Sequence, residues 1–165
     1  YYFGPFFRHD NPQKGRWRQF WQFGLEVLGS KHSISDATII RLNCLILETV
    51  GLKNPIVSIN SLGDTECRAA FQKDLSTYYR KNAKNICADC RQRLKTNPLR
   101  VLDCKSDKCQ PFKAEAPEIL NYLNPDSKKH FQEVLEYLDN MKIDYEIDPL
   151  MVRGLDYYKD RKSVV

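Results

Sequence analysis

Residues 7–22 read Phe-Arg-His-Asp-Asn-Pro-Gln-Lys-Gly-Arg-Trp-Arg-Gln-Phe-Trp-Gln, and this stretch is the most informative part of the chain. The polar segment 11–15, which contains proline and glycine, predicts a tight loop between two strands. Arg8 precedes this loop and Arg16 follows it. A guanidinium group is planar, keeps its charge and binds phosphate oxygens through two nitrogens at once. The two arginines are therefore suited to holding a polyphosphate.

The strand after the loop alternates with a period of two residues. Its first face is almost entirely apolar and consists of Gln19, Trp21, Phe23, Leu25 and Val27. Its second face is mostly polar and consists of Arg18, Phe20, Gln22, Gly24 and Glu26. We predict that the apolar face packs on a core and that the polar face lines a pocket, where Gly4 and Gly24 leave room for a ligand. The alternative is a hairpin whose polar face only meets water.

The residues after the hairpin predict a helix and a further strand. Ser35 and Asp36 are typical N-cap residues, and an apolar stripe that includes Cys44 predicts a buried helix face before Gly51. Residues 56–60 are rich in β-branched side chains and predict a strand. Residues 1–60 therefore predict part of an antiparallel sheet with a backing helix.

The character of the chain changes near residue 61. Helical spacing of apolar residues predicts helices at 65–80 and 127–141, and residues 143–147 predict a short strand. We place a mainly helical α/β domain at 61–148 and a return to the first domain at 149–165, so the predicted fold class is α+β. The basic stretch from Lys73 to Arg100 suits contact with phosphates, and an ordinary solvated surface is an equal alternative.

Four of the six cysteines have the spacing of metal ligands. Cys87-x2-Cys90 is followed by thirteen residues and then by Cys104-x4-Cys109. Two short loops that each supply two thiolates can close a tetrahedral Zn²⁺ site, and such a site would be structural because four thiolates fill its coordination shell. The alternative is four small, half-buried residues without a metal.

Two segments resemble a known family. Residues 1–29 resemble motif 2 of the class II histidyl-tRNA synthetases, and Leu-Met-Val-Arg-Gly-Leu-Asp-Tyr-Tyr at 150–158 resembles the histidine-specific motif of the same family. The second match is the more specific of the two. Asn-Ser-Leu-Gly at 60–63 and Thr-Asn-Pro-Leu-Arg-Val-Leu-Asp at 96–103 are also similar to that family, so the resemblance runs through nearly the whole chain.

The resemblance implies ATP-dependent activation of histidine to histidyl-adenylate, with Mg²⁺, followed by transfer to tRNA(His) in a homodimer. Carboxylate attack on the α-phosphate builds charge on the phosphoryl oxygens, which positively charged donors can stabilise. The implied ATP-binding residues are Arg8 at the α-phosphate, Arg16 at the outer phosphates, Arg153 at the reacting centre and Asp10 near the adenine. Arg8 and Arg153 are the implied catalytic residues. The implied histidine-binding residues are Gln22, Glu26, Arg153, Tyr157 and Tyr158.

The chain departs from the family pattern at three places, one of which is Trp21, where the family usually has His or a similar polar residue. The family usually has Glu-Arg where this chain has Asp10 and Asn11, which shortens one acid and removes a positive charge from the loop. The charged segment 159–162 stands where the family continues into an apolar strand, and it predicts exposed coil. In the resembled family, residues 61–148 correspond to an insertion that reaches toward the tRNA acceptor stem.

The start of the sequence and its composition give expectations about completeness and solubility. The chain opens inside an apolar strand without an initiator Met, so we expect a fragment that is inactive alone. With 42% hydrophobic residues and no long apolar run, we expect a soluble cytoplasmic protein with no membrane contact. Two alternatives to the ligase are a synthetase-like, histidine-sensing regulatory subunit and a zinc-stabilised RNA-binding module.

Overall fold

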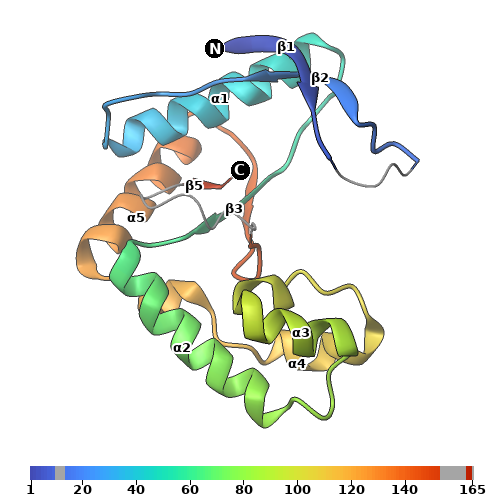
Figure 1. Cartoon of the computed structure of the whole chain (residues 1–165). Coiled ribbons are helices and arrows are strands. Elements are labelled where there is room, and N and C mark those ends of the chain that lie inside the picture. The colour runs from blue at the N-terminus through green and yellow to red at the C-terminus, as the bar shows by residue number, and fades with distance from the viewer. Residues whose placement is uncertain (10–13, 153–162, 165) are drawn as a thin grey trace.

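The computed structural model describes residues 1–9, 14–152 and 163–164, and it combines helices with two small sheets (Figure 1). In the described residues, a hairpin and the helices α1 (Ser33–Thr49) and α5 (Pro125–Asn140) form the upper part of the view. Helices α2 (Thr65–Lys81), α3 (Ala88–Thr96) and α4 (Gln110–Ala114) form the lower part. Strand β3 (Val57–Ser61) runs between these two parts. The predicted α+β class is therefore seen in its coarse form, as two small sheets combined with helices.

The N-terminal hairpin pairs β1 (Tyr2–Phe7) with β2 (Gln19–Gly24) in an antiparallel register. Phe6 lies opposite Phe20 and Tyr2 lies opposite Gly24, so the predicted alternation of faces is correct. Strand β2 ends at Gly24, three residues before the predicted end at Val27. The predicted packing of the apolar face is not seen within the described residues, where Trp21 remains 65% exposed.

Helix α1 (Ser33–Thr49) begins two residues earlier than its sequence predicts. Its N-cap residue is His32, which makes no side-chain capping bond, so the predicted cap at Ser35 and Asp36 is wrong. Asp36 lies in the first turn, where its negative charge complements the helix dipole. Cys44 is buried, as predicted.

Helix α5 (Pro125–Asn140) packs along α1 (Figure 1). The Ser33 hydroxyl donates a hydrogen bond to the Glu133 carboxylate at 2.6 Å. The Nε2 atom of His130 lies 2.8 Å from a carboxylate oxygen of Asp36. These two polar pairs fix the register of the helices, and His130 is half-buried between them.

The second sheet has the order β4–β3–β5. Strand β3 (Val57–Ser61) pairs in parallel with β4 (Tyr145–Ile147) and antiparallel with β5 (Ser163–Val164). The prediction that the strand near 56–60 shares one antiparallel sheet with the hairpin is therefore wrong for the described residues. The reason is that the partners of β3 come from segments more than 80 residues further along the chain.

One buried cluster joins α1, α5, β3 and β4, and we call it the helix-pair core. Its fully buried members come from α1, β3 and the inner face of α5. The residues of the helix-pair core are Ala37, Ile40, Cys44, Val57, Ile59, Phe131, Val134, Leu138 and Ile143. Helix α5, which lies inside the predicted 61–148 domain, thus shares a core with α1. The domain division at residues 60 and 148 stays a prediction.

The lower part of the molecule consists of α2 (Thr65–Lys81), α3 (Ala88–Thr96), η1 (Pro98–Val101), η2 (Asp107–Cys109), α4 (Gln110–Ala114) and η3 (Ile119–Tyr122). We call its buried cluster the cysteine core. The members are Phe71, Leu75, Tyr79, Ile86, Cys90, Leu94, Val101, Leu102, Cys104, Cys109, Ala116, Ile119 and Val152. Val152, which follows β4 in the sequence, therefore packs in the core of this lower part.

Among the helices of the described residues, none combines the length with the apolar character that crossing a membrane would require.

Candidate functional site

The hairpin holds Arg8 in a defined position. The backbone N–H of Arg8 donates to the carbonyl of Arg18 at 2.9 Å, which continues the β1–β2 ladder by one residue pair. The Nε–H of Arg8 donates to the carbonyl of Trp17 at 2.7 Å. The guanidinium carbon also lies 4.2 Å from the centroid of the Phe20 ring. These contacts use Nε and one face of the guanidinium group, and they therefore set the plane in which its remaining donors lie.

Gln22 occupies the same face of the hairpin as Arg8. Its side-chain amide donates to the hydroxyl of Tyr2 at 3.1 Å. The Tyr2 ring lies over Gly24, where an added Cβ atom would meet the Tyr2 Cζ atom. The prediction that Gly24 leaves room for a ligand is therefore wrong in this structure, because Tyr2 fills that space. The space beside Gly4 is open, with no described atom within 4 Å of a Cβ atom built there.

For the other predicted ATP- and histidine-binding residues, the structure gives either only an exposed position or no described position. Arg16 is exposed at the end of the loop, and Glu26 is exposed two residues beyond the end of β2. Asp10, Arg153, Tyr157 and Tyr158 lie outside the described residues, as does the segment 159–162. The structure brings Arg8 and Gln22 to one face. The convergence of the remaining residues on that face stays a prediction.

Two residues that support this face were missed by the sequence prediction of the site. Phe20 lies under the guanidinium group of Arg8, and Tyr2 accepts the hydrogen bond from Gln22. The signal was present in the alternation, because both aromatic residues fall on the otherwise polar face. An aromatic residue on a polar face is a natural support for a cationic or amide side chain.

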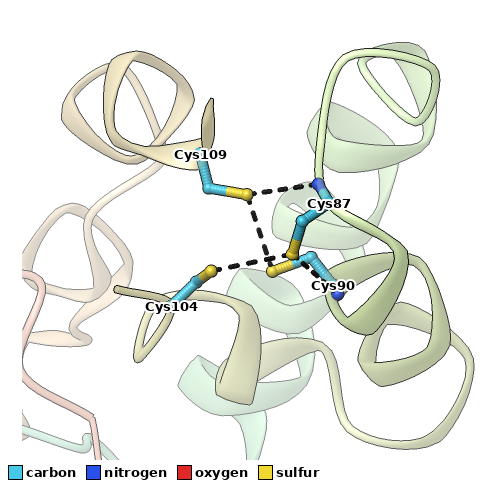
Figure 2. A group of neighbouring side chains, drawn as sticks. All are labelled: Cys87, Cys90, Cys104 and Cys109. Atoms are coloured by element: carbon cyan, nitrogen blue, oxygen red, sulfur yellow. Dashed lines mark hydrogen bonds between the residues drawn. The ribbon is translucent and has the colours of Figure 1, made fainter. Parts of the chain in front are cut away.

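The four cysteines of the predicted metal site are brought together by two separate segments (Figure 2). All four Sγ atoms lie within 4.8 Å of one another. The Sγ atoms of Cys87 and Cys104 are 3.8 Å apart, and so are those of Cys90 and Cys109. Cys87 is half-buried and the other three are buried. The predicted grouping of these residues is therefore confirmed as a cluster.

Local backbone structure explains why the first pair converges. Cys87 is the N-cap residue of α3, and its sulfur accepts the backbone N–H of Cys90 at 3.4 Å. The second pair is held by the turn before η2, where the sulfur of Cys104 accepts the backbone N–H of Ser106 at 3.4 Å. A link between the pairs runs from the backbone N–H of Cys87 to the sulfur of Cys109, at 3.3 Å.

The thiols of the cluster differ in acidity. The pKa of Cys87 is lowered to about 7, chiefly because the backbone N–H of Cys90 donates to its sulfur and favours the thiolate. Burial raises the pKa of Cys90 and of Cys109. One partly exposed thiol thus ionises near neutral pH, while two buried thiols keep their protons unless a positive charge compensates the thiolates.

Comparisons of the whole chain with known proteins find its relatives among the aminoacyl-tRNA ligases. The family model described as histidyl-tRNA synthetase matches residues 1–159. The histidine–tRNA ligase of Bacillus subtilis (strain 168) is 48% identical over 158 residues, which cover 96% of this chain and 37% of the relative. Histidine–tRNA ligase 1 of Shouchella clausii (strain KSM-K16) is 49% identical over the same shares of the two chains.

A solved structure agrees with these relatives. The crystal structure of apo histidyl-tRNA synthetase from S. aureus is 34% identical and superimposes with a TM-score of 0.69, over 98% of this chain and 37% of that chain. The chain belongs to the histidyl-tRNA synthetase family. It spans a little more than one third of the length of the curated relatives that it matches.

Proposed function

We propose that the full-length protein is a histidine–tRNA ligase of class II, which activates histidine with ATP and transfers it to tRNA(His). The observation that carries the proposal is the family match over residues 1–159 combined with the held position of Arg8 on the hairpin face. The reported relatives give no support to the histidine-sensing subunit or to the RNA-binding module. The chain covers 37% of the length of the Bacillus subtilis relative, so the proposed activity is assigned to the longer protein.

Arg8 is proposed to bind the α-phosphate of ATP. Adenylation joins two anions, the histidine carboxylate and the α-phosphate, and pyrophosphate leaves. A guanidinium group with a fixed plane can stabilise the charge on the phosphoryl oxygens without reorganising during the reaction. The Trp17 carbonyl and the Phe20 ring support this function because they fix the group from two directions. Mg²⁺ would neutralise further phosphate charge.

Three other charged residues complete the proposed nucleotide site. Arg16, which is exposed where the loop ends, is proposed to bind the outer phosphates. Arg153 is proposed to act at the reacting centre and Asp10 near the adenine. The support for Arg153 and Asp10 is their place in the two sequence motifs.

The proposed histidine site consists of Gln22, Glu26, Arg153, Tyr157 and Tyr158. Gln22 would bind the polar end of the amino acid, and its bond to Tyr2 fixes the amide from behind. Glu26 and Tyr158 would bind the imidazole. A carboxylate that accepts a ring N–H selects against amino acids without that donor, because an unpaired buried polar group costs roughly 1–3 kcal/mol.

The partners follow from the proposed reaction. They are histidine, ATP and tRNA(His), with a second copy of the full-length chain as a homodimer in the cytoplasm. Residues of the lower part of the molecule are proposed to contact the tRNA phosphates, supported by the basic residues between Lys73 and Arg100.

The test is aminoacylation by the full-length protein. Purified protein is incubated with ATP, Mg²⁺, labelled histidine and an unfractionated tRNA pool, and the labelled tRNA is isolated and sequenced. The proposal expects label on tRNA(His) alone. Absence of labelled tRNA, or charging of another tRNA, would refute the assignment.

A further inference from the structure

We infer that Cys87, Cys90, Cys104 and Cys109 bind one structural Zn²⁺ ion that holds the cysteine core together. The inference does not depend on the proposed ligase activity. It rests on the geometry of the four sulfur atoms, the donors around them and the segments that they join.

The sulfur geometry matches a tetrahedral tetrathiolate site. Zn–S bonds of about 2.3 Å place the sulfurs of a regular tetrahedron about 3.8 Å apart. Two of the sulfur pairs are separated by 3.8 Å, and every pair lies within 4.8 Å. Disulfide sulfurs would lie about 2 Å apart, so the cluster has the spacing of metal ligands rather than of bonded pairs.

The surroundings of the sulfurs suit the charge of such a site. Four thiolates around Zn²⁺ carry a net charge of −2, which backbone N–H donors can stabilise. Three N–H groups, those of Cys87, Cys90 and Ser106, already point at sulfur atoms at 3.3–3.4 Å. The hydroxyl of Tyr79 is buried in the same core and has no hydrogen-bond partner among the described residues. It is therefore an uncommitted donor within the cysteine core.

The ligand set and the burial determine the kind of metal site. Four soft sulfur ligands in a tetrahedron select zinc, or iron in a sulfur cluster, over magnesium or calcium. All four coordination positions are filled by protein, and three of the four cysteines are buried. Such a closed site leaves no position for a substrate, so the ion is structural.

The site joins two segments of the cysteine core that are separated by thirteen residues in the sequence. Cys87 and Cys90 lie at the start of α3, whereas Cys104 and Cys109 flank the turn that leads into α4 (Figure 2). Val152 is buried in the same core. Metal binding would therefore stabilise the lower part of the molecule and the segment that runs from β4 to Val152.

The experiment measures bound metal in the full-length protein purified without added metal. Elemental analysis is expected to find one zinc and no iron per chain. Cys104→Ser and Cys109→Ser are expected to lose this zinc. Cys67→Ser is the matched control, because Cys67 is equally buried and its sulfur accepts the backbone N–H of Asn124 at 3.3 Å, outside the cluster. The control is expected to keep one zinc.

A second measurement covers the case in which the cluster variants do not fold. Wild-type protein is stripped with a chelator under reducing conditions and titrated with Co²⁺. The inference expects a one-to-one end point, with the absorption bands of tetrahedral thiolate-bound cobalt, and a thermal unfolding midpoint that rises when Zn²⁺ is restored. Protein that contains no zinc, shows no such bands and unfolds at the same temperature with and without Zn²⁺ would overturn it. Iron in place of zinc, or two disulfides found by mass spectrometry in freshly purified protein, would also overturn it.

Discussion

The guanidinium group of Arg8 lies over the ring of Phe20, with its carbon 4.2 Å from the ring centroid. Phe20 is on β2, Arg8 directly follows β1, and the Trp17 carbonyl fixes the same guanidinium group through Nε. A cation held in this way is oriented before any phosphate arrives. The pair is therefore the structural basis for the proposed function of Arg8 in adenylation.

Replacing Arg8 by lysine is expected to slow histidine-dependent ATP–pyrophosphate exchange in the full-length protein by about 10²-fold or more. Lysine keeps the charge but loses the fork that binds two phosphate oxygens, and the loss of one such donor commonly costs on the order of 10²–10³ in kcat. The measurement is kcat with saturating ATP and histidine. Phe20→Leu is the companion variant and is expected to have a smaller effect, since it leaves the guanidinium group but removes its support. Equal rates for wild type and Arg8→Lys would contradict this function.

Glu26→Gln is expected to raise the KM for histidine by about tenfold with a smaller change in kcat. The carboxylate is proposed to accept an imidazole N–H, and the loss of about 1.4 kcal/mol of binding corresponds to a factor of ten. The measurement is the histidine dependence of exchange at saturating ATP. Glu66→Gln, at an exposed position in the first turn of α2, is the matched control. An unchanged KM for Glu26→Gln would remove Glu26 from the histidine site.

The ionised carboxylate of Asp64 is expected to make the free energy of unfolding depend on pH. It caps α2 by accepting the backbone N–H of Cys67 at 2.9 Å, and it also accepts the side-chain amide of Asn124, which caps α5. The Cys67 N–H bond lowers the pKa of Asp64 below its ordinary value. Because the folded pKa is depressed, the stabilisation is fully present above the unfolded value, about 3.9, and is lost as pH falls through the folded pKa.

We therefore expect wild type to lose more stability than Asp64→Asn between pH 7 and acid pH. Asparagine can still cap the helix but carries no charge to lose. Asp64→Ala removes the cap at every pH, at a cost of roughly 0.5–2 kcal/mol. Thermal unfolding midpoints across the pH range measure the difference. Parallel curves for wild type and Asp64→Asn would show that the charge of Asp64 does not stabilise the fold.

Gly63 is expected to tolerate no side chain. Its φ is +59°, in the left-handed region, and an added Cβ atom would lie 2.7 Å from the Cβ atom of Cys67. Gly63→Ala therefore combines a backbone cost of roughly 1–2 kcal/mol with an overpacking cost of typically 1–3 kcal/mol. Gly51→Ala is the control, because Gly51 has φ +92° and open space around it.

The thermal unfolding midpoint is expected to fall clearly further for Gly63→Ala than for Gly51→Ala. Both variants place alanine at a positive φ, but only the added Cβ of Gly63→Ala meets neighbours, the side chains of Cys67 and Leu123. Equal midpoints would mean that the lower part of the molecule relaxes around the added methyl group.

Local sequence patterns predicted the long helices α2 and α5 well, but they did not predict α3 or α4. Thr65–Lys81 and Pro125–Asn140 lie within two residues of their predicted bounds at each end, because an apolar stripe at helical spacing is a local signal. The pairing of β3 with β4 was not predictable in the same way. A parallel partner more than 80 residues away leaves no local pattern, and neither does the pairing of His130 with Asp36.

The candidate sites likewise combine features that a local sequence pattern predicts with features that depend on distant residues. The spacing of Cys87, Cys90, Cys104 and Cys109 predicted their grouping because short spacers constrain geometry. The alternation of β2 placed Gln22 on the face of Arg8. It did not show that Tyr2 fills the space beside Gly24, since that depends on which residue lies opposite in the register.

The most direct test of the account is the amino-acid dependence of ATP–pyrophosphate exchange by the full-length protein. Each of the twenty amino acids is supplied separately with ATP, Mg²⁺ and labelled pyrophosphate. The account predicts exchange with histidine and none with the other nineteen. Exchange with a different amino acid, or no exchange with histidine, would contradict it.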